Sequence, residues 1–338
     1  MSQDSKTIGW GIIGCGDVTE TKSGPGFQKA RNSRLVAVMR RDTERARDYA
    51  RRHGVPRWYD DAQALVEDSE VDAVYVATPP SSHREYALLA ARVGKPVYVE
   101  KPMALNLGEC EEMIAACRKA GVPLYVAYYR RALDKFLKIK QLVTDGVIGE
   151  VRLVRVTLSQ AATPEEMEGH LPWRVIPKIA GGGHFVDLAS HMLDFLDDLL
   201  GPIATDTAAV TVKGTAVNQA GYYDAEDTVT ASFAFQSGVQ GVGSWCFVAS
   251  EAQDHTEIVG TKGTIGYATF GTGPVTLVAD GSARELPVSF PRHIQQPLIQ
   301  TVVDALNDRG ECPSTGESGA RTTRVMDAIL EEYRTESR

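Results

Sequence analysis

Several features that mark common classes of protein are missing from this chain of 338 residues. No segment approaches the roughly 20 uninterrupted apolar residues that a helix needs to cross a bilayer. The five cysteines contain no C-x-x-C pair, which argues against a disulfide framework and against a zinc knot. We expect them to be reduced thiols, most of them buried.

An excess of positive charge is also missing. The chain has 36 Lys and Arg against 44 Asp and Glu, and the two signs are interleaved, which argues against duplex nucleic acid as a partner. Residues 1–7 are polar and the apolar core region of a secretory signal peptide does not follow them, so we expect a cytoplasmic protein. At roughly 150 residues per domain, the length predicts two domains, which we place at residues 1–127 and 128–338.

The first third of the chain alternates β-branched runs with helical patterns. The expected strands are residues 7–14, 35–40, 71–78, 97–99 and 124–127. The expected helices are residues 42–53, a helix opened by a capping box at 82–85, and residues 107–119. Strands and helices at this spacing predict an α/β fold with a parallel sheet and right-handed crossovers.

Longer strands dominate after about residue 127. They are expected at 150–160, 204–213, 227–235 and 239–250, with glycine-containing hairpin turns at 261–263 and 271–273. Alternating apolar residues predict an antiparallel sheet with one face on helices and the other free to pair. Further helices are expected at 132–145, 298–307 and 320–334.

A glycine cluster follows the first expected strand directly. Glycines there let the chain turn tightly and let a diphosphate approach backbone N–H groups at a helix N-terminus. Thr19 stands where a third Gly or Ala is usual. The position inside a strand–helix–strand unit still favours a dinucleotide site, formed by Gly14, Cys15, Gly16, Asp17 and Val18.

The second expected strand ends in Arg40-Arg41-Asp42. Sites for NAD place an acidic residue there to hold the ribose 2′-hydroxyl, whereas a guanidinium suits the 2′-phosphate of NADP. We therefore expect NADP as the preferred cofactor, with NAD as the alternative. The arginines could also form a solvated cluster in which Asp42 caps the next helix, and Asp42 could itself contact a ribose.

Two more segments carry groups suited to catalysis. Lys101 follows a central strand at its carboxyl end, where open α/β sheets bind ligands, and the next residue, Pro102, restricts its direction. Asp187 and His191 share one helix face after the glycines at 181–183. An amine that stabilises an alkoxide and an imidazole that accepts a proton suit hydride exchange at a secondary alcohol. Each residue alone is more often an ordinary surface group, and only their joint occurrence favours catalysis.

The ordered set of motifs resembles the glucose-fructose oxidoreductase and inositol dehydrogenase family (Gfo/Idh/MocA) over nearly the whole chain. The motifs are the glycine cluster, Thr78-Pro79-Pro80 with His83, Glu100-Lys101-Pro102, the run 181–191, Glu226-Asp227-Thr228 and residues 260–264. The resemblance implies an N-terminal Rossmann domain with a doubly wound parallel sheet. It also implies a C-terminal α/β domain with an open, mainly antiparallel sheet, and a cis peptide before Pro102.

The resemblance also assigns roles to single residues. Lys101 would contact the nicotinamide ribose and the substrate oxygen, His191 would exchange the proton, and Asp187 would orient or relay it. The cofactor site would include, besides the glycine turn and Lys101, the residues Arg40, Arg41, Thr78, Pro79, His83 and Glu100.

Substrate contacts are expected, besides the catalytic residues, from Arg130, Trp173 and His184. Trp173 could equally be packing, and His184 could be a capped surface residue. The spacing of His184, Asp187 and His191 would also permit a metal site, but no further cluster of ligands stands out and we expect no metal.

These observations predict an NADP-preferring oxidoreductase acting on a secondary alcohol or ketone of a sugar, sugar derivative or cyclitol, in a pocket between the two domains. The alternatives are an oxidoreductase of aromatic trans-diols or other carbonyls, or a non-enzymatic protein that senses nicotinamide cofactors. We expect no nucleic-acid or membrane partner, and a homodimer or homotetramer formed through the C-terminal sheet.

Overall fold

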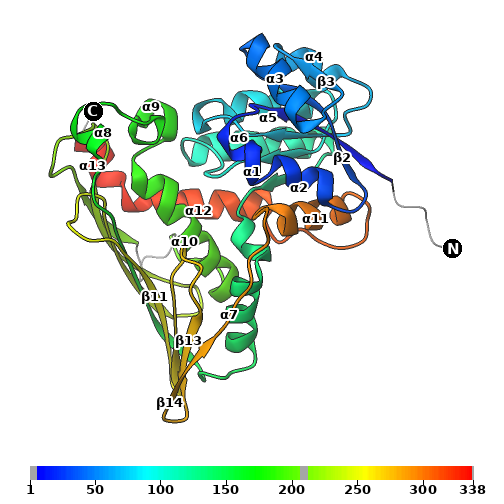
Figure 1. Cartoon of the computed structure of the whole chain (residues 1–338). Helices are drawn as coiled ribbons and strands as arrows, with labels where there is room; N and C mark the ends of the chain where they lie inside the picture. Colours follow the sequence, from blue (N-terminus) through cyan, green and yellow to red (C-terminus); the bar gives the residue numbers. More distant parts are fainter. Residues whose placement is uncertain (1–5, 206–211, 337–338) are drawn as a thin grey trace. The chain divides into compact units, whose positions relative to one another are not determined.

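The computed structural model describes residues 6–205 and 212–336. The chain forms two compact units, Met1–Leu133 with Pro291–Ala320 and Asp134–Phe290 with Arg321–Arg338. Figure 1 follows the chain through its helices and strands. Within the described ranges, no helix is long and apolar enough to cross a membrane.

The first unit is built on a six-stranded sheet in which every neighbouring pair is parallel. Its strand order is β3-β2-β1-β4-β5-β6, so the order reverses between β1 and β4, as in a doubly wound Rossmann sheet. This confirms the expected fold of the N-terminal part. The strands are β1 (Ile8–Ile13), β2 (Ser33–Met39), β3 (Arg57–Tyr59), β4 (Ala73–Val76), β5 (Val97–Val99) and β6 (Leu124–Val126).

The helices of this unit begin and end largely where local chemistry dictates. They are α1 (Asp17–Thr21), α2 (Gly24–Lys29), α3 (Thr43–His53), α4 (Ala62–Glu67), α5 (His83–Arg92), α6 (Leu107–Ala120) and α11 (Gln296–Ala305). Asp42 and Asn106 accept hydrogen bonds at the starts of α3 and α6. Gly54 and Gly121 end these helices with φ values of 65° and 69°, which glycine adopts at little cost.

The capping box expected at residues 82–85 is wrong. A short 3-10 helix, η1 (Pro80–Ser82), leads directly into α5, and the Ser82 side chain makes no capping hydrogen bond. Its hydroxyl donates instead to Oγ1 of Thr78 at 2.8 Å. The preceding turn leaves the Ser82 backbone outside the extended conformation that an N-cap residue usually adopts.

Aromatic rings fill one face of the parallel sheet. Trp10 packs against Phe27 with ring centroids 4.7 Å apart, Phe27 against Tyr75 at 5.1 Å, and Tyr75 stacks on Tyr98 at 5.1 Å. All four side chains are buried. Aliphatic residues of the same strands, such as Ile13 and Val74, belong to a separate buried cluster with α4, α5 and α6, so both faces of the sheet are covered.

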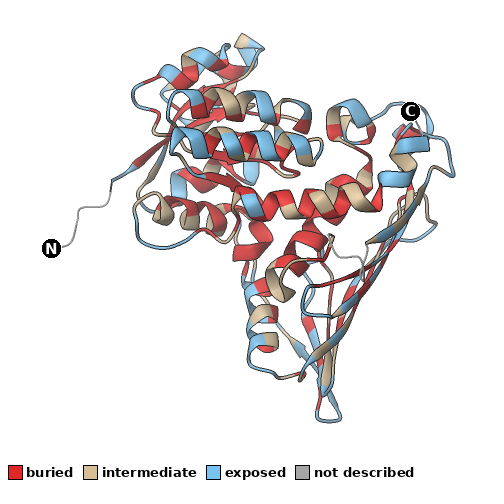
Figure 2. Cartoon of the chain, turned by 180° about the vertical axis from the view of Figure 1, so that it is seen from behind, coloured by how far each residue is buried: buried red, intermediate tan, exposed pale blue. Residues whose placement is uncertain are grey.

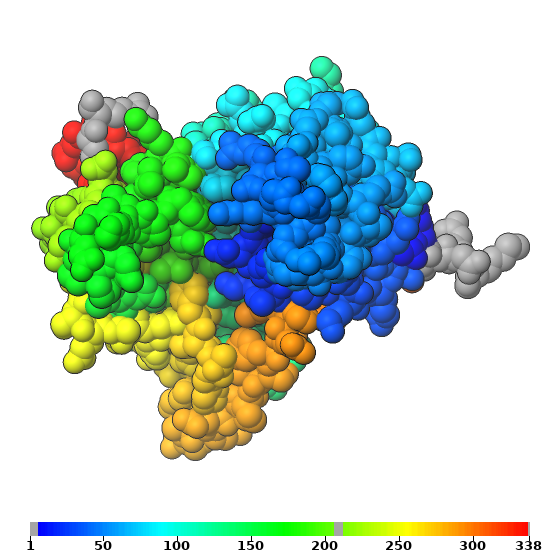
Figure 3. Space-filling view, turned by 45° about the horizontal axis from the view of Figure 1, so that its top comes forward, coloured from blue at the N-terminus to red at the C-terminus, as the bar shows by residue number. Residues whose placement is uncertain are grey.

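Residues 291–320, which we call the returning segment, belong to the first unit and border its last strand, β6. Ser314 and Val126 exchange backbone and side-chain hydrogen bonds at 3.1 and 2.7 Å, and Thr315 forms an antiparallel bridge with Tyr125. Helix α11, drawn in orange, packs beside α2 (Figures 1 and 3). The edge of β6 is therefore covered by residues that lie about 190 positions later.

The second unit contains an eight-stranded sheet in the order β14-β13-β12-β11-β7-β10-β9-β8. Among the strands of this sheet that the structure describes, only β7 and β10 pair in parallel, so the expectation of a mainly antiparallel sheet is confirmed. The turns expected at 261–263 and 271–273 connect neighbouring antiparallel strands. The strands are β7 (Val151–Ser159), β8 (Lys213–Val217), β9 (Thr228–Ala234), β10 (Gln240–Cys246), β11 (Gln253–Gly260), β12 (Gly263–Tyr267), β13 (Val275–Ala279) and β14 (Ser282–Leu286).

The strand expected at 204–213 falls mostly on residues 206–211, outside the described part, and β8 begins at its last position. The helices of the second unit are α7 (Asp134–Thr144), α8 (Pro164–Met167), α9 (Pro177–Ala180), α10 (His184–Leu200) and α13 (Glu331–Glu336), with α12 (Gly316–Ile329) beginning in the first unit.

One face of this sheet packs on helices and the other does not. Trp245 and Phe233 from the strands bury against Phe185 and Met192 of α10. Buried and exposed residues alternate along β10, and Figure 2 shows buried and exposed colours along the strands of this sheet. Val242 on the opposite face is 44% exposed. All five cysteines are free thiols and four are buried, as expected.

We predict that Ser314→Ala lowers the free energy of unfolding by about 1 kcal/mol, because it removes a buried hydrogen bond to the Val126 carbonyl. Urea denaturation followed by circular dichroism measures the change. Ser81→Ala removes the same hydroxyl from an exposed position and serves as the control. Equal stability of the two variants would contradict a structural role for the returning segment.

Candidate active site

The turn after β1 depends on two glycines for different reasons. Gly14 has a φ of +92°, and a Cβ atom there would lie 2.6 Å from Cγ2 of Thr78. A Cβ on Gly16 would meet nothing closer than the Gly14 carbonyl oxygen at 3.9 Å. The space beside Gly16, which is the N-cap of α1, therefore fits the close approach of a dinucleotide diphosphate to the backbone.

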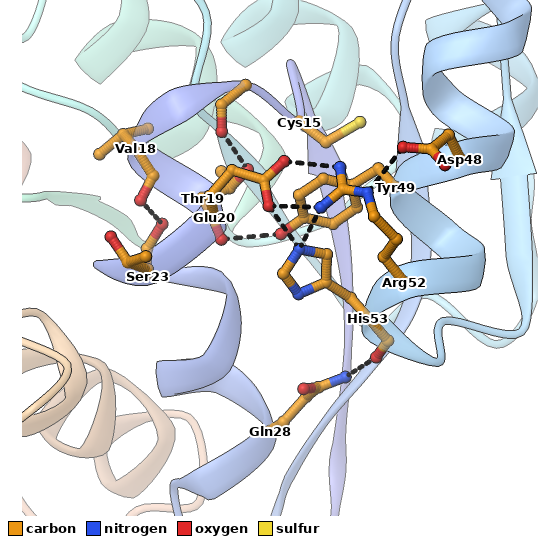
Figure 4. Close-up of polar contacts among 12 residues, drawn as sticks. Cys15, Val18, Thr19, Glu20, Ser23, Gln28, Asp48, Tyr49, Arg52 and His53 are labelled. Carbon is orange, nitrogen blue, oxygen red and sulfur yellow. Dashed lines mark hydrogen bonds and ion pairs between the residues drawn. The ribbon is translucent and has the colours of Figure 1, made fainter.

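A polar network behind this turn ties α1 to α3 (Figure 4). The Glu20 carboxylate accepts hydrogen bonds from both terminal nitrogens of Arg52, each at 2.8 Å, and contacts Nε2 of His53 at 2.7 Å. Hydrogen bonding by Arg52 is the main cause that lowers the pKa of Glu20 to about 2. Tyr49 stacks on His53 and donates to the Thr19 carbonyl at 2.8 Å. These contacts fix the position of α1, the helix that follows the glycine turn, against α3.

The end of β2 presents a guanidinium rather than a free carboxylate. Arg40 is half-buried, and its Nη1 donates to the Cys15 carbonyl at 3.2 Å, while Arg41 is exposed. Asp42 caps α3, with one oxygen accepting from the Arg45 amide at 3.1 Å and the other lying 3.3 Å from Nε of Arg45. Both oxygens of the nearest acidic side chain are thus engaged within the helix start.

The loops after β4 and β5 are joined by a buried imidazole. Nε2 of His83 lies 2.7 Å from the Thr78 carbonyl, and Nδ1 lies 3.1 and 3.2 Å from the carbonyls of Pro102 and Met103. Burial lowers the pKa of His83, although these carbonyl contacts oppose the effect. The buried ring therefore contacts both loops and limits their conformations. The peptide between Lys101 and Pro102 is cis, as the resemblance implies.

Glu100 is also buried under the loop that carries Lys101. Its carboxylate accepts hydrogen bonds from the Tyr75 hydroxyl and from Nε2 of Gln295 at 2.6 Å, and its other oxygen accepts from the Lys101 amide at 3.1 Å. The carboxylate therefore orients the backbone at Lys101. Gln295 belongs to the returning segment, and the sequence analysis assigned it no role.

In the second unit, a buried carboxylate binds the backbone just before α10, where two glycines are closely packed. Oε1 of Glu226 accepts from the Gly183 amide at 2.8 Å, and a Cβ on Gly182 or Gly183 would lie 2.5 to 2.7 Å from the nearest neighbouring atoms. Burial raises the pKa of Glu226 to about 7. In the sequence, Glu226 stands out only as part of a family motif, and its structural role becomes visible only in the fold.

One face of α10 carries His184, Asp187 and His191, spaced three and four residues apart. Oδ2 of Asp187 lies 3.3 Å from Nε of Arg174, whose guanidinium covers the ring of Trp173 at 4.4 Å. Trp173 thus supports Arg174, which in turn pairs with Asp187. This ion pair keeps a carboxylate oriented on the face of the helix that carries His191.

The ring of His191 is 4% exposed and meets the ring of Phe270 edge to face at 5.9 Å. The loop that carries Phe270 is held by Asp254, whose carboxylate accepts hydrogen bonds from the amides of residues 269–271. Phe270 and Asp254 follow no pattern that the sequence analysis used. Phe270 lies in the β12–β13 connection and Asp254 lies on β11, so only the structure brings the two together.

Arg130 lies in the first unit on η2 (Tyr129–Ala132), is 4% exposed, and has its guanidinium over the Tyr129 ring at 5.0 Å. Tyr128 beside it is fully buried.

In residues 6–205 and 212–336, no group of three His, Cys, Asp or Glu side chains could hold a metal ion. His184 and Asp187 contact Glu166 and Arg174 respectively.

We predict that Glu226→Gln removes a pH dependence of stability. The variant keeps an acceptor for the Gly183 amide but cannot ionise. Because the pKa of Glu226 is about 7 in the fold and 4.5 ordinarily, the wild type binds the proton more tightly when folded. Its stabilising contribution is complete below pH 4.5 and is lost as the pH rises to about 7.

Over this interval the wild type should lose up to about 3 kcal/mol of unfolding free energy that the variant retains. Urea denaturation at a series of pH values measures the difference. Glu285→Gln changes an exposed carboxyl and should follow the wild type. A Glu226→Gln variant that also follows the wild type would show that this carboxyl is not the cause.

Comparisons with known proteins cover nearly the whole chain. A family model described as "Oxidoreductase family, NAD-binding Rossmann fold" matches residues 8–128, and the "GFO/IDH/MocA C-terminal domain" matches residues 136–266. Oxidoreductase P35 of Formosa agariphila is 40% identical over 95% of this chain and 98% of its own length. A 1,5-anhydro-D-fructose reductase of Ensifer adhaerens is 30% identical, over 92% of this chain and 91% of its own.

The fold is shared with solved structures. An aldose-aldose oxidoreductase from Caulobacter crescentus, complexed with glycerol, is 26% identical with a TM-score of 0.86, and 98% of each chain is covered. A levoglucosan dehydrogenase in complex with NADH and levoglucosan has a TM-score of 0.84 at 22% identity, covering 97% of this chain and 98% of that chain. This chain therefore belongs to the Gfo/Idh/MocA family and is an oxidoreductase with an NAD(P)-binding Rossmann fold.

Proposed function

We propose that the protein is an NADP-preferring oxidoreductase that interconverts a secondary alcohol and a ketone on a sugar, a sugar derivative or a cyclitol. The observation that carries the proposal is the set of loops at the carboxyl-terminal end of the first sheet. The open glycine turn follows β1, and Lys101 follows β5, at the carboxyl ends of strands in a doubly wound sheet, where such sheets bind ligands.

Different residues of these loops would bind different parts of the dinucleotide. Gly14, Cys15, Gly16, Asp17 and Val18 would receive the diphosphate, and Thr78, Pro79 and Lys101 would line the nicotinamide side. His83 and Glu100 are buried, so we assign them the task of fixing those loops. When bound, the nicotinamide ring accepts or returns a hydride.

Lys101 and His191 would then act on one substrate oxygen. In alcohol oxidation, the carbinol C–H bond breaks and its electron pair leaves as hydride, while the hydroxyl proton passes to the imidazole of His191. The ammonium of Lys101 stabilises the negative charge that develops on the oxygen. Asp187, paired with Arg174, orients the proton acceptor, and the reverse sequence reduces a ketone.

The preference for NADP is supported by the end of β2. Arg40 and Arg41 provide positive charge there, and both oxygens of Asp42 are engaged at the start of α3. A charge-assisted fork of N–H donors suits a phosphate ester better than a ribose hydroxyl. NAD remains the alternative cofactor, because solved structures of this fold hold NADH as well as NADP.

A sugar-like substrate is supported by the named activities of relatives, such as the 1,5-anhydro-D-fructose reductase. The second candidate is a trans-diol of an aromatic ring. A trans-1,2-dihydrobenzene-1,2-diol dehydrogenase of Danio rerio is 30% identical over 83% of this chain and 80% of its own. An assay that follows NADPH absorbance with polyols, keto-sugars and aromatic diols as substrates separates the two.

We also propose Arg130, Trp173 and His184 as substrate contacts.

The domain boundary at residue 127, the cytoplasmic location and the homodimer or homotetramer stay predictions. Assembly through the second sheet is supported by exposed valines on its uncovered face, namely Val217, Val242 and Val278. Size-exclusion chromatography with light scattering would give the oligomeric state.

We predict that Lys101→Ala lowers turnover by orders of magnitude while NADP binding stays measurable. The substitution removes the charge that stabilises the substrate oxygen but leaves the glycine turn unchanged. Initial rates and NADPH fluorescence titration give the two quantities. Lys119→Ala removes an exposed lysine of α6 and should match the wild type, and an equally active Lys101→Ala enzyme would refute the catalytic role.

We predict that Arg40→Asp shifts the ratio of the dissociation constants for NADP and NAD by roughly 10- to 100-fold towards NAD. This corresponds to the loss of one charge-assisted interaction with a phosphate. Titration of both dinucleotides measures the ratio. Arg92→Asp makes the same charge change at an exposed site on α5 and serves as the control. An unchanged ratio in Arg40→Asp would contradict the proposed NADP preference.

A further inference from the structure

His184 has a fixed partner that distinguishes it from an ordinary surface histidine. Its Nε2 lies 2.7 Å from Oε1 of Glu166 on α8. The other carboxylate oxygen of Glu166 accepts from the backbone amide of Thr163 at 2.9 Å, and the Thr163 side chain accepts in return from the Glu166 amide. Glu166 is only 2% exposed, so both of its oxygens are committed within the protein.

The Glu166 carboxylate is ionised in this setting. Burial alone would raise the pKa of Glu166, but the hydrogen bonds from Thr163 and His184 outweigh it and hold the pKa below its ordinary value. An ionised carboxylate can only accept hydrogen bonds. The atom that faces it, Nε2 of His184, must therefore carry a proton.

Two aromatic rings hold the imidazole in one orientation. The ring of Tyr223 meets it edge to face at 5.9 Å, and the ring of Phe247 lies 5.4 Å away at 45°. The Nδ1 atom of His184 makes no hydrogen bond within residues 6–205 and 212–336, and it does not belong to the buried polar atoms that lack a partner there. The His184 side chain keeps 18% of its surface exposed, so Nδ1 is not fully buried and remains available to a ligand.

The same helix face carries Asp187 and His191. His184 precedes His191 by seven residues, which is nearly two helical turns and about 10 Å along the axis. A small alcohol that reacts at His191 cannot span this distance. A molecule at least as large as a sugar ring with its substituents can approach both imidazoles.

We propose that Glu166 keeps the proton of His184 on Nε2, so that Nδ1 accepts a hydrogen bond from a substrate hydroxyl remote from the reacting carbon. Glu166 is a positioning residue, and His184 is the residue that selects polyhydroxylated substrates. This inference rests on the proposed function, since it assumes that His191 marks the reacting carbon. It narrows the substrate class to sugars and glycosides with a free hydroxyl away from the oxidised position.

The test is a substitution that reverses the hydrogen bond. In Glu166→Gln, the side-chain carbonyl can still accept from Thr163, but the amide NH₂ then faces His184 and favours the proton on Nδ1. The acceptor becomes a donor with little change in shape. Glu165→Gln removes the same charge from the adjacent, exposed position of α8 and is the matched control.

The first readout is the tautomer, measured by ¹⁵N NMR on protein labelled at its seven histidines. The spectra are recorded at about pH 9, above the ordinary imidazole pKa of about 6.5. The His184→Asn spectrum assigns the signal by its absence. We expect a proton on Nε2 in the wild type and in Glu165→Gln, and on Nδ1 in Glu166→Gln.

The second readout is kinetic, with a polyol or keto-sugar turned over by the wild type as the probe and an aromatic trans-diol for comparison. Glu166→Gln should raise the KM for the sugar by about tenfold, which is typical of one lost hydrogen bond, with kcat and the dissociation constant of NADP within twofold. The KM for the diol should not change. His184→Gln can place an amide donor near the position of Nε2, facing Glu166, but it has no acceptor at the position of Nδ1, and it should raise the sugar KM in the same way.

A proton on Nδ1 in the wild type, or an equal KM in Glu166→Gln and Glu165→Gln, would overturn the inference. A loss of stability in Glu166→Gln without a change in KM would show that the pair only fastens α8 to α10. Failure of the proposed function is recognised separately. It would appear as full activity of Lys101→Ala or as turnover of neither substrate class, whereas the tautomer measurement requires no turnover.

Discussion

The imidazole of His83 bridges the two loops that flank the centre of the first sheet, and the order of that edge depends on it. A buried backbone carbonyl without a donor costs as much as a lost hydrogen bond, and the loops after β4 and β5 each contribute carbonyls at this point. Both ring nitrogens face carbonyls, but the neutral imidazole donates to only one loop at a time, and only the protonated ring donates to both. Because Thr78 also limits the space beside Gly14, the shape of the glycine turn and the position of Lys101 are linked through the same few contacts.

The second unit uses buried carboxylates in a comparable way. Glu226 binds the amide that begins α10, and Glu166 binds the first side chain of that helix. Arg174 holds Asp187 one turn further along. His184 and Asp187 on this face of α10 thus each have a charged partner at a short distance. Such pairs add little to net stability but limit the orientations that a side chain can adopt.

Much of this arrangement follows from local sequence. The β-branched runs give five strands of the first sheet, and the glycine cluster predicts the turn after β1, because these signals span only a few neighbouring residues. Strand β3 was missed because it has three residues, none of them fully buried, and therefore no apolar pattern. The partners Glu166, Arg174, Gln295 and Phe270 were missed as such, because each depends on a contact between distant segments. Only Thr163 with Glu166 has a local signal, a capping box that the sequence analysis did not use.

The return of residues 291–320 has a consequence for how this protein can be divided. The chain passes between the two units at three places, after Leu133, Phe290 and Ala320, and the third crossing lies inside α12. A gene fragment that ends at the first crossing encodes the whole parallel sheet but lacks the segment that covers β6 and the glutamine that binds Glu100. Neither unit is therefore encoded by one contiguous stretch of the gene. Recombination that replaced one unit with that of a relative would have to join two sequences inside α12 without breaking the helix.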